Sequence, residues 1–118
     1  MNEDFVTFEQ AVKLKELGFD WECISKYNEE HKFVICAKFR DNNQSDWDIS
    51  APTLSQAQKW LREVKGIDVH YDYGRNKWTY YWGRRWSQAL YEEEYDTPID
   101  ALSAGIDKVL EYLKGNEK

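Results

Sequence analysis

The sequence predicts a single α+β domain covering residues 1–118, in which an antiparallel, aromatic-rich sheet packs against two or three helices. Three observations support this prediction. Segments with apolar residues at three- and four-residue spacing are bounded by capping signals, which is typical of helices. Other segments alternate apolar and polar residues, which is typical of half-buried strands. Aromatic residues make up 16% of the chain, with six Trp and eight Tyr, and flat rings pack well on a pleated sheet.

The clearest helix is predicted between Thr53 and Gly66. Thr53 and Gln56 have the spacing of a capping box, and Gly66 stands where a left-handed residue ends a helix. We expect Trp60 to anchor the core rather than to form an exposed binding site, because a large aromatic on a periodic apolar stripe usually buries area. The apolar face comprises Leu54, Ala57, Trp60, Leu61 and Val64.

Two further helices are predicted by the same signals. The first covers residues 7–17 and ends at Gly18, and the last begins at Thr97, with Pro98 in the first helical position, and ends near residues 114–115. The last helix has the most regular apolar face in the chain, formed by Ile99, Leu102, Ile106, Val109, Leu110 and Leu113.

All three helices open with the pattern Thr-x-x-(Gln/Asp)-Ala. This repetition has two interpretations. One is an internal duplication of a helix–hairpin unit, with halves at about 5–50 and 51–115, and the other is the independent recurrence of good N-caps.

A first hairpin is predicted from strands at 21–27 and 32–39, joined by a loop at 28–31. A four-residue loop places Cys23 directly opposite Cys36. These cysteines are interpreted either as a redox-sensitive cross-strand pair or as two small buried residues on one sheet face, and the second interpretation is favoured.

A polar, turn-rich segment at 41–46 is predicted to be a mobile loop. A second hairpin follows, with strands at 67–73 and 77–82 and a tight turn at 74–76. Its aromatic and aliphatic side chains are expected to share one face of each strand, and a third, shorter strand is expected at 85–91. The residues on that face are Ile67, Val69, Tyr71 and Tyr73 in one strand and Trp78, Tyr80 and Trp82 in the other.

Composition narrows the class of protein. The net charge of −6 opposes a general binder of nucleic acid or anionic membranes, because such proteins usually carry excess Lys and Arg. No apolar run approaches the length of a membrane span, and the polar N-terminus does not resemble a signal peptide. The two cysteines show no Cys-x-x-Cys spacing, which fits a reducing compartment. We therefore expect a cytoplasmic protein without membrane partners.

Catalytic and nucleotide-binding motifs are absent from the sequence. The glycines show no phosphate-loop spacing, and no Ser or Cys has a partner His by motif. Asp68, His70 and Asp72 share one strand face, but residues two apart on a strand lie about 7 Å from each other, too far to hold one metal ion unaided. The sequence therefore predicts a protein that is not an enzyme and that uses no cofactor or metal. An enzyme of unknown type is the least favoured alternative, and a deep pocket that gathers His70 with carboxylates from another element would support it.

One stretch, residues 75–86, interleaves four basic residues with five aromatics and contains no acid. It is interpreted in three ways: a hot-spot surface for a protein partner, a nucleic-acid contact through its basic side chains, or a hairpin whose outer charges only keep it soluble. The protein partner is preferred to nucleic acid as a function. The candidate binding residues are Arg75, Lys77, Tyr81, Trp82, Arg84, Arg85 and Trp86.

From residue 53 onwards, the element order resembles that of double-stranded-RNA-binding domains. Their second helix typically starts with a lysine-rich motif, whereas residues 96–100 are acidic here, which opposes RNA binding.

The segments at 6–19, 51–62 and 101–107 resemble a family of small uncharacterised proteins from phages and prophage-like elements of gut bacteria. The resemblance covers nearly the full chain. It implies a phage or mobile-element accessory protein that acts in the host cytoplasm, and it carries no active-site residues.

Overall fold

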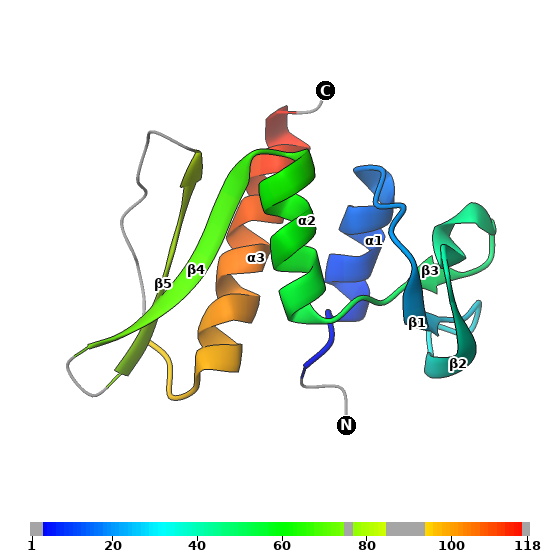
Figure 1. The fold of residues 1–118 in the computed structure, drawn as a ribbon, viewed down its shortest axis with the longest axis horizontal. Coiled ribbons are helices and arrows are strands. Elements are labelled where there is room, and N and C mark those ends of the chain that lie inside the picture. Colours follow the sequence, from blue (N-terminus) through cyan, green and yellow to red (C-terminus); the bar gives the residue numbers. More distant parts are fainter. Residues whose placement is uncertain (1–3, 75–76, 85–93, 117–118) are drawn as a thin grey trace. The chain divides into compact units, whose positions relative to one another are not determined.

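The computed structural model describes residues 4–74, 77–84 and 94–116 and divides the chain into two compact units (Figure 1). The N-terminal unit is Met1–Thr53 and the C-terminal unit is Leu54–Lys118. Both units contain helix and antiparallel strands, so the predicted α+β class is confirmed. The described strands form two sheets, one in each unit, where the sequence predicts one.

The first helix, α1 (Phe8–Glu16), has the caps that the sequence predicts. Thr7 and Gln10 form a capping box: the Thr7 hydroxyl accepts the Gln10 N–H at 3.1 Å, and the Gln10 side chain accepts the Thr7 N–H at 2.9 Å. At the other end, Gly18 has a φ of +96°, and the N–H of buried Phe19 donates to the carbonyl five residues earlier at 3.0 Å. This geometry is a Schellman motif, which requires the left-handed glycine.

The N-terminal sheet has the strand order β2-β1-β3, with β1 (Cys23–Tyr27) in the centre, β2 (Phe33–Arg40) on one side and β3 (Ile49–Ser50) on the other. The sequence does not predict β3, which is only two residues long. Just after β3, Ala51 is bonded twice to Ser25: its N–H donates to the Ser25 carbonyl at 3.0 Å, and its carbonyl accepts the Ser25 hydroxyl at 2.6 Å. These bonds continue the sheet contact beyond the short strand.

The register of β1 and β2 differs from the predicted one. The loop between them spans residues 28–32, one residue longer than predicted, because the Asn28 side chain accepts two backbone N–H groups inside the loop. A bulge in the pairing then places Cys23 opposite Arg40 rather than opposite Cys36. The predicted cross-strand pairing of the two cysteines is therefore wrong.

Within the predicted loop at 41–46, the structure forms a short 3-10 helix, η1 (Asn42–Gln44). Asn43 ties it to its surroundings, since its side-chain N–H donates to the Phe19 carbonyl at 2.9 Å and its side-chain oxygen accepts the Ser50 N–H at 2.8 Å. The sequence signals a turn here but not these two distant partners.

The C-terminal unit begins with α2 (Leu54–Val64). Trp60 is 1% exposed, so its predicted role as a core anchor is confirmed. Gly66 has a φ of +72°, as predicted for the residue that ends this helix. The prediction that Val64 lies on the buried face is wrong: Val64 is the last residue of α2 and is 52% exposed.

The second hairpin is formed by β4 (Ile67–Gly74) and β5 (Lys77–Arg84), which pair antiparallel along their full lengths, as predicted. On the other side of β5, Trp78 and Tyr95 exchange two backbone hydrogen bonds of 2.8 and 2.7 Å. The third strand predicted at 85–91 lies outside the described residues.

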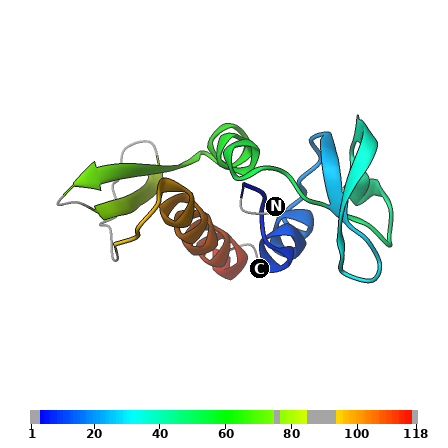
Figure 2. The ribbon, with the colours of Figure 1, turned by 90° about the horizontal axis from the view of Figure 1, so that it is seen from below.

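The last helix, α3 (Pro98–Asn116), packs across both strands of this hairpin (Figures 1 and 2). Thr97 caps it by accepting the Asp100 N–H at 3.1 Å. At Gly105 the helix backbone approaches the sheet so closely that a Cβ atom would lie 2.8 Å from Cγ1 of Val69 and 3.2 Å from Cβ of Tyr80. As predicted, its buried face includes Leu102, Ile106, Val109, Leu110 and Leu113.

We predict that Gly105→Ala lowers the free energy of unfolding by about 1–3 kcal/mol, because the added methyl group overpacks the contact with Val69. Gly115→Ala is the matched control, since it lies in the same helix and a Cβ there meets nothing within 4 Å. The control should be neutral or stabilising by up to about 1 kcal/mol, the gain in helix propensity. Urea denaturation measures both changes, and equal stabilisation by the two would contradict the close approach.

We also predict that Asn43→Ala lowers the free energy of unfolding by about 1–3 kcal/mol, because it removes the acceptor of the Ser50 N–H and the donor to Phe19. Gln44→Ala, at the exposed neighbouring position of η1, should change stability by less than about 0.5 kcal/mol. Thermal denaturation followed by circular dichroism compares the two variants. Equal losses of stability in the two variants would show that the hydrogen bonds of the Asn43 side chain do not contribute specifically.

Candidate functional site

An exposed aromatic cluster lies at the turn end of the β4–β5 hairpin. Tyr71 and Tyr73 are 42% and 54% exposed, and their ring centroids lie 5.8 and 5.0 Å from that of Trp78 on the neighbouring strand. We call these three residues the hairpin cluster. On the same sheet face, Ile67 and Val69 are at most 2% exposed. The strands thus extend past their helical cover, and Figures 1 and 2 show the turn end of the hairpin pointing away from α2 and α3.

The predicted binding residues do not gather on one surface. Trp82 is half-buried, with its ring 5.2 Å from that of Tyr112 on α3, whereas Tyr81 lies on the opposite sheet face, 5.4 Å from the ring of His70. Arg84 is the last residue of β5. Three more of these predictions, for Arg75, Arg85 and Trp86, fall outside the described residues.

Lys77, the remaining predicted residue, is engaged by a carboxylate. Its ammonium group lies 2.5 Å from Oδ1 of Asp96, a residue just before α3. This hydrogen bond raises the pKa of Lys77 and lowers the pKa of Asp96. Both side chains stay solvent-exposed, so their positive and negative charges largely cancel at the surface.

The sequence pattern of the strand at 67–73 does not identify Tyr71 and Tyr73 as binding residues. Their alternation with Ile67 and Val69 places all four on one face, which is correct, but it does not tell which part of the face a helix covers. The sequence signal for exposure is their position next to the turn predicted at 74–76.

The described surroundings of the hairpin cluster are acidic. Asp68 and Asp72 are exposed on the opposite face of β4, and Glu94 and Asp100 are exposed before and in the first turn of α3. The aromatic surface is therefore bordered by carboxylates, which attract basic groups and repel phosphates.

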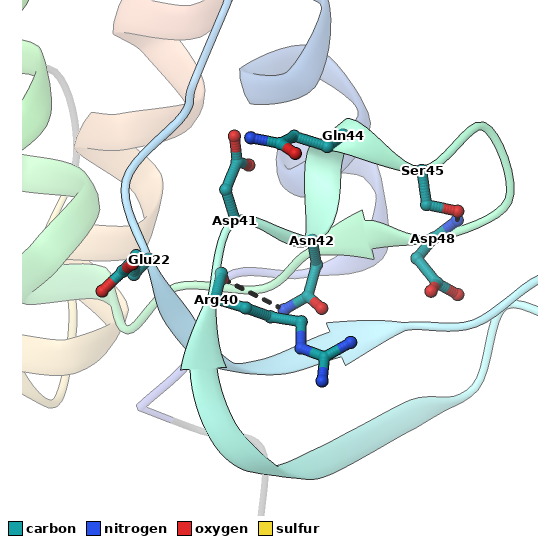
Figure 3. A pocket seen from close by; sticks show the side chains of 7 residues that line it. All are labelled: Glu22, Arg40, Asp41, Asn42, Gln44, Ser45 and Asp48. Carbon is teal, nitrogen blue, oxygen red and sulfur yellow. Dashed lines mark hydrogen bonds between the residues drawn. The ribbon is translucent and has the colours of Figure 1, made fainter.

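A polar depression of about 470 Å³ opens in the N-terminal unit (Figure 3). Two of its side chains have structural roles: the Asp48 carboxylate lies 2.9 Å from the ammonium of Lys26, and the Ser45 hydroxyl accepts the Trp47 N–H at 3.0 Å. His70 does not line this depression but lies on β4. The depression therefore does not gather His70 with carboxylates, the arrangement that would support an enzyme. The described lining residues are Glu22, Arg40, Asp41, Asn42, Gln44, Ser45 and Asp48.

Both cysteines are thiols. Cys23 is 1% exposed, and its thiol donates a weak hydrogen bond of 3.6 Å to the Trp21 carbonyl. Burial raises the pKa of Cys23 to about 12, so the reactive thiolate is scarce at neutral pH. Cys36 is partly exposed. These features favour the interpretation of Cys23 as a small buried residue.

The described parts of the chain bear on two further features, a metal site and a membrane-spanning helix. Within those ranges, no group of three or more His, Cys, Asp or Glu side chains is arranged to hold a metal ion, so Asp68, His70 and Asp72 form no such site. No helix there is long and apolar enough to cross a membrane.

Comparisons with protein-family models, with curated proteins and with solved structures give no match for this chain.

We predict that iodoacetamide modifies Cys36 but not Cys23 in the folded protein at neutral pH, because burial suppresses the Cys23 thiolate. Peptide mass spectrometry locates the label, and denaturation in urea should make both thiols reactive. The Cys36→Ser variant should remain unlabelled until it unfolds. Rapid labelling of Cys23 in that folded variant would contradict its burial.

Proposed function

We propose that this protein is a non-catalytic binding protein that contacts a protein partner through the hairpin cluster of Tyr71, Tyr73 and Trp78. The observation that carries this proposal is the exposure of Tyr71 and Tyr73, whose rings contact half-buried Trp78 on a strand pair that two helices hold in place. Trp and Tyr dominate the hot spots of protein interfaces, because they bury a large area and lose little conformational entropy.

The position of the cluster supports binding as well. The buried half of the hairpin is fixed against α3 at Gly105, so the exposed half is presented on a rigid base. A preorganised surface loses less entropy when a partner docks. The proposed binding surface thus stays on the aromatic hairpin predicted at 75–86, but its centre moves to the turn end, where Tyr71 and Tyr73 of β4 join Trp78.

Charge favours a protein partner over nucleic acid. On this hairpin, the charge of Lys77 is neutralised by Asp96, and Asp68 and Asp72 add negative charge nearby. Affinity for nucleic acid depends on uncompensated positive charge, which neutralises phosphates. A polypeptide can satisfy both parts of this surface. Its apolar side chains can pack on the aromatic rings, and its basic side chains can pair with the carboxylates.

The resemblance of three segments to phage and prophage proteins extends the proposal to a biological role. We propose an accessory protein of a phage or mobile element, which acts in the host cytoplasm by occupying a surface of another protein. A protein of this kind needs an exposed contact surface and no reactive group.

The test is a selection of peptides from a random display library on the immobilised protein. Affinities of the selected peptides are then measured by fluorescence anisotropy. The double variant Tyr71→Ser, Tyr73→Ser should bind at least about 30-fold more weakly, the loss expected for a hot spot of about 2 kcal/mol. Its fold should be retained, because both side chains are exposed.

The matched control is Trp47→Ser, which removes a 70% exposed aromatic from the N-terminal unit and should leave these affinities unchanged. A labelled oligothymidylate serves as the nucleic-acid probe. Oligothymidylate binding that weakens with added salt, together with no peptide that depends on Tyr71 and Tyr73, would overturn the proposal in favour of nucleic acid.

A further inference from the structure

The outer edge of β4 carries backbone groups that point away from β5. In an antiparallel pair, alternate residues direct both their N–H and C=O toward the partner strand, and the residues between them direct both outward. The Val69 carbonyl accepts a hydrogen bond from the side-chain amide of Gln58 on α2, which identifies Val69 as an outward-facing residue. Tyr71 and Tyr73 have the same phase, so their backbone groups point to the same edge.

Neighbouring positions on this edge are already bonded, but Tyr71 is not. The Gln58 side chain on α2 donates a hydrogen bond to the Val69 carbonyl, and the Asp72 carboxylate accepts the Tyr73 N–H at 2.9 Å. In the part of the chain that the structure describes, no residue forms a hydrogen bond with the outward N–H or C=O of Tyr71. Tyr71 is therefore the position where another strand could pair with β4.

The two faces beside this edge differ in chemistry. One face carries the rings of Tyr71 and Tyr73, and the other carries the exposed carboxylates of Asp68 and Asp72. Side chains of an added strand alternate between the same two faces. One set of its side chains would lie over the rings and the other set over the carboxylates.

We infer that β4 binds an extended peptide of alternating apolar and basic residues, which adds as a strand along the outer edge at Tyr71. One peptide N–H donates to the Tyr71 carbonyl, and one peptide carbonyl accepts the Tyr71 N–H. Apolar side chains of the peptide cover the tyrosine rings, and its Lys or Arg side chains face Asp68 and Asp72. This inference rests on the proposed function, because it uses the same cluster and names the partner class and its mode of binding.

The first measurement uses an end-blocked peptide of alternating lysine and valine, about seven residues long, within the usual length of a strand. Amide hydrogen exchange is followed by NMR on the full chain with and without the peptide. The Tyr71 amide should exchange at least about tenfold more slowly in the complex, whereas the His70 amide, which faces β5, should not change. A peptide with alternate N-methylated residues, placed to remove the donors facing β4, should bind at least about tenfold more weakly.

The second measurement tests the charges. The double variant Asp68→Asn, Asp72→Asn should bind the peptide about fivefold more weakly, since two exposed ion pairs are lost. The substitutions are isosteric, and Asn at position 72 still offers an oxygen to the Tyr73 N–H. Asp46→Asn, at an exposed position in the other unit, is the control and should bind as the wild type does.

Strand addition and the proposed function fail in different ways. If the peptide binds through Tyr71 and Tyr73 but the N-methylated form binds equally well and the Tyr71 amide is unprotected, strand addition is overturned and aromatic binding stands. If the peptide does not bind, strand addition is also overturned, while library peptides that depend on the two tyrosines would still support the proposed function. Loss of both kinds of binding overturns both.

Discussion

The close approach of α3 to the β4–β5 hairpin at Gly105 sets the geometry of the C-terminal unit. Because a side chain there would collide with Val69 and Tyr80, the glycine lets the helix backbone lie directly on the sheet. Helix and hairpin therefore pack tightly at one end of the strands. At eight residues each, the strands are longer than the part that the helices cover, so the turn end extends into solvent. The exposed aromatic cluster follows from this mismatch.

In the N-terminal unit, polar groups rather than apolar packing hold the segment after β2. The ammonium of Lys15 on α1 donates to the carbonyls of Ser45 and Asp48, both at 2.8 Å, and Asn43 links Phe19 to Ser50. These hydrogen bonds join the segment between β2 and β3 to α1 and to β3. The polar depression in Figure 3 is lined by this same segment, so its shape is a consequence of the bonds that order the loop.

The edges of the hairpin connect its architecture to the proposed binding. An exposed edge strand can pair with other chains, and proteins commonly limit this by covering it. Here Gln58 covers part of β4, and Tyr95 pairs with Trp78 on β5. The outward groups of Tyr71 lie between aromatic rings and carboxylates, which would restrict an added strand to a particular pattern of side chains. Selectivity would then come from the two faces, and affinity from the rings and the backbone.

The sequence by itself determined the α+β class and the positions of the helices and the two hairpins. The caps at Thr7 and Thr97, the left-handed glycines and the apolar stripe around Trp60 are local signals, and each acts within a few residues. Residue alternation likewise determined that Tyr71 and Tyr73 share a face with Val69.

Only the tertiary structure decided the register of the first hairpin, the short strand β3 and the surface on which the aromatics are exposed. Cys23 lies opposite Arg40 because of one extra loop residue and a bulge, and periodicity carries no information about either. Whether a tyrosine is core or surface depends on where α3 stops covering the strands, and this is set by contacts between residues that are far apart in the chain, such as Gly105 and Val69. A local pattern assigns a side chain to a face, but burial needs a second element, and its placement is a property of the folded chain.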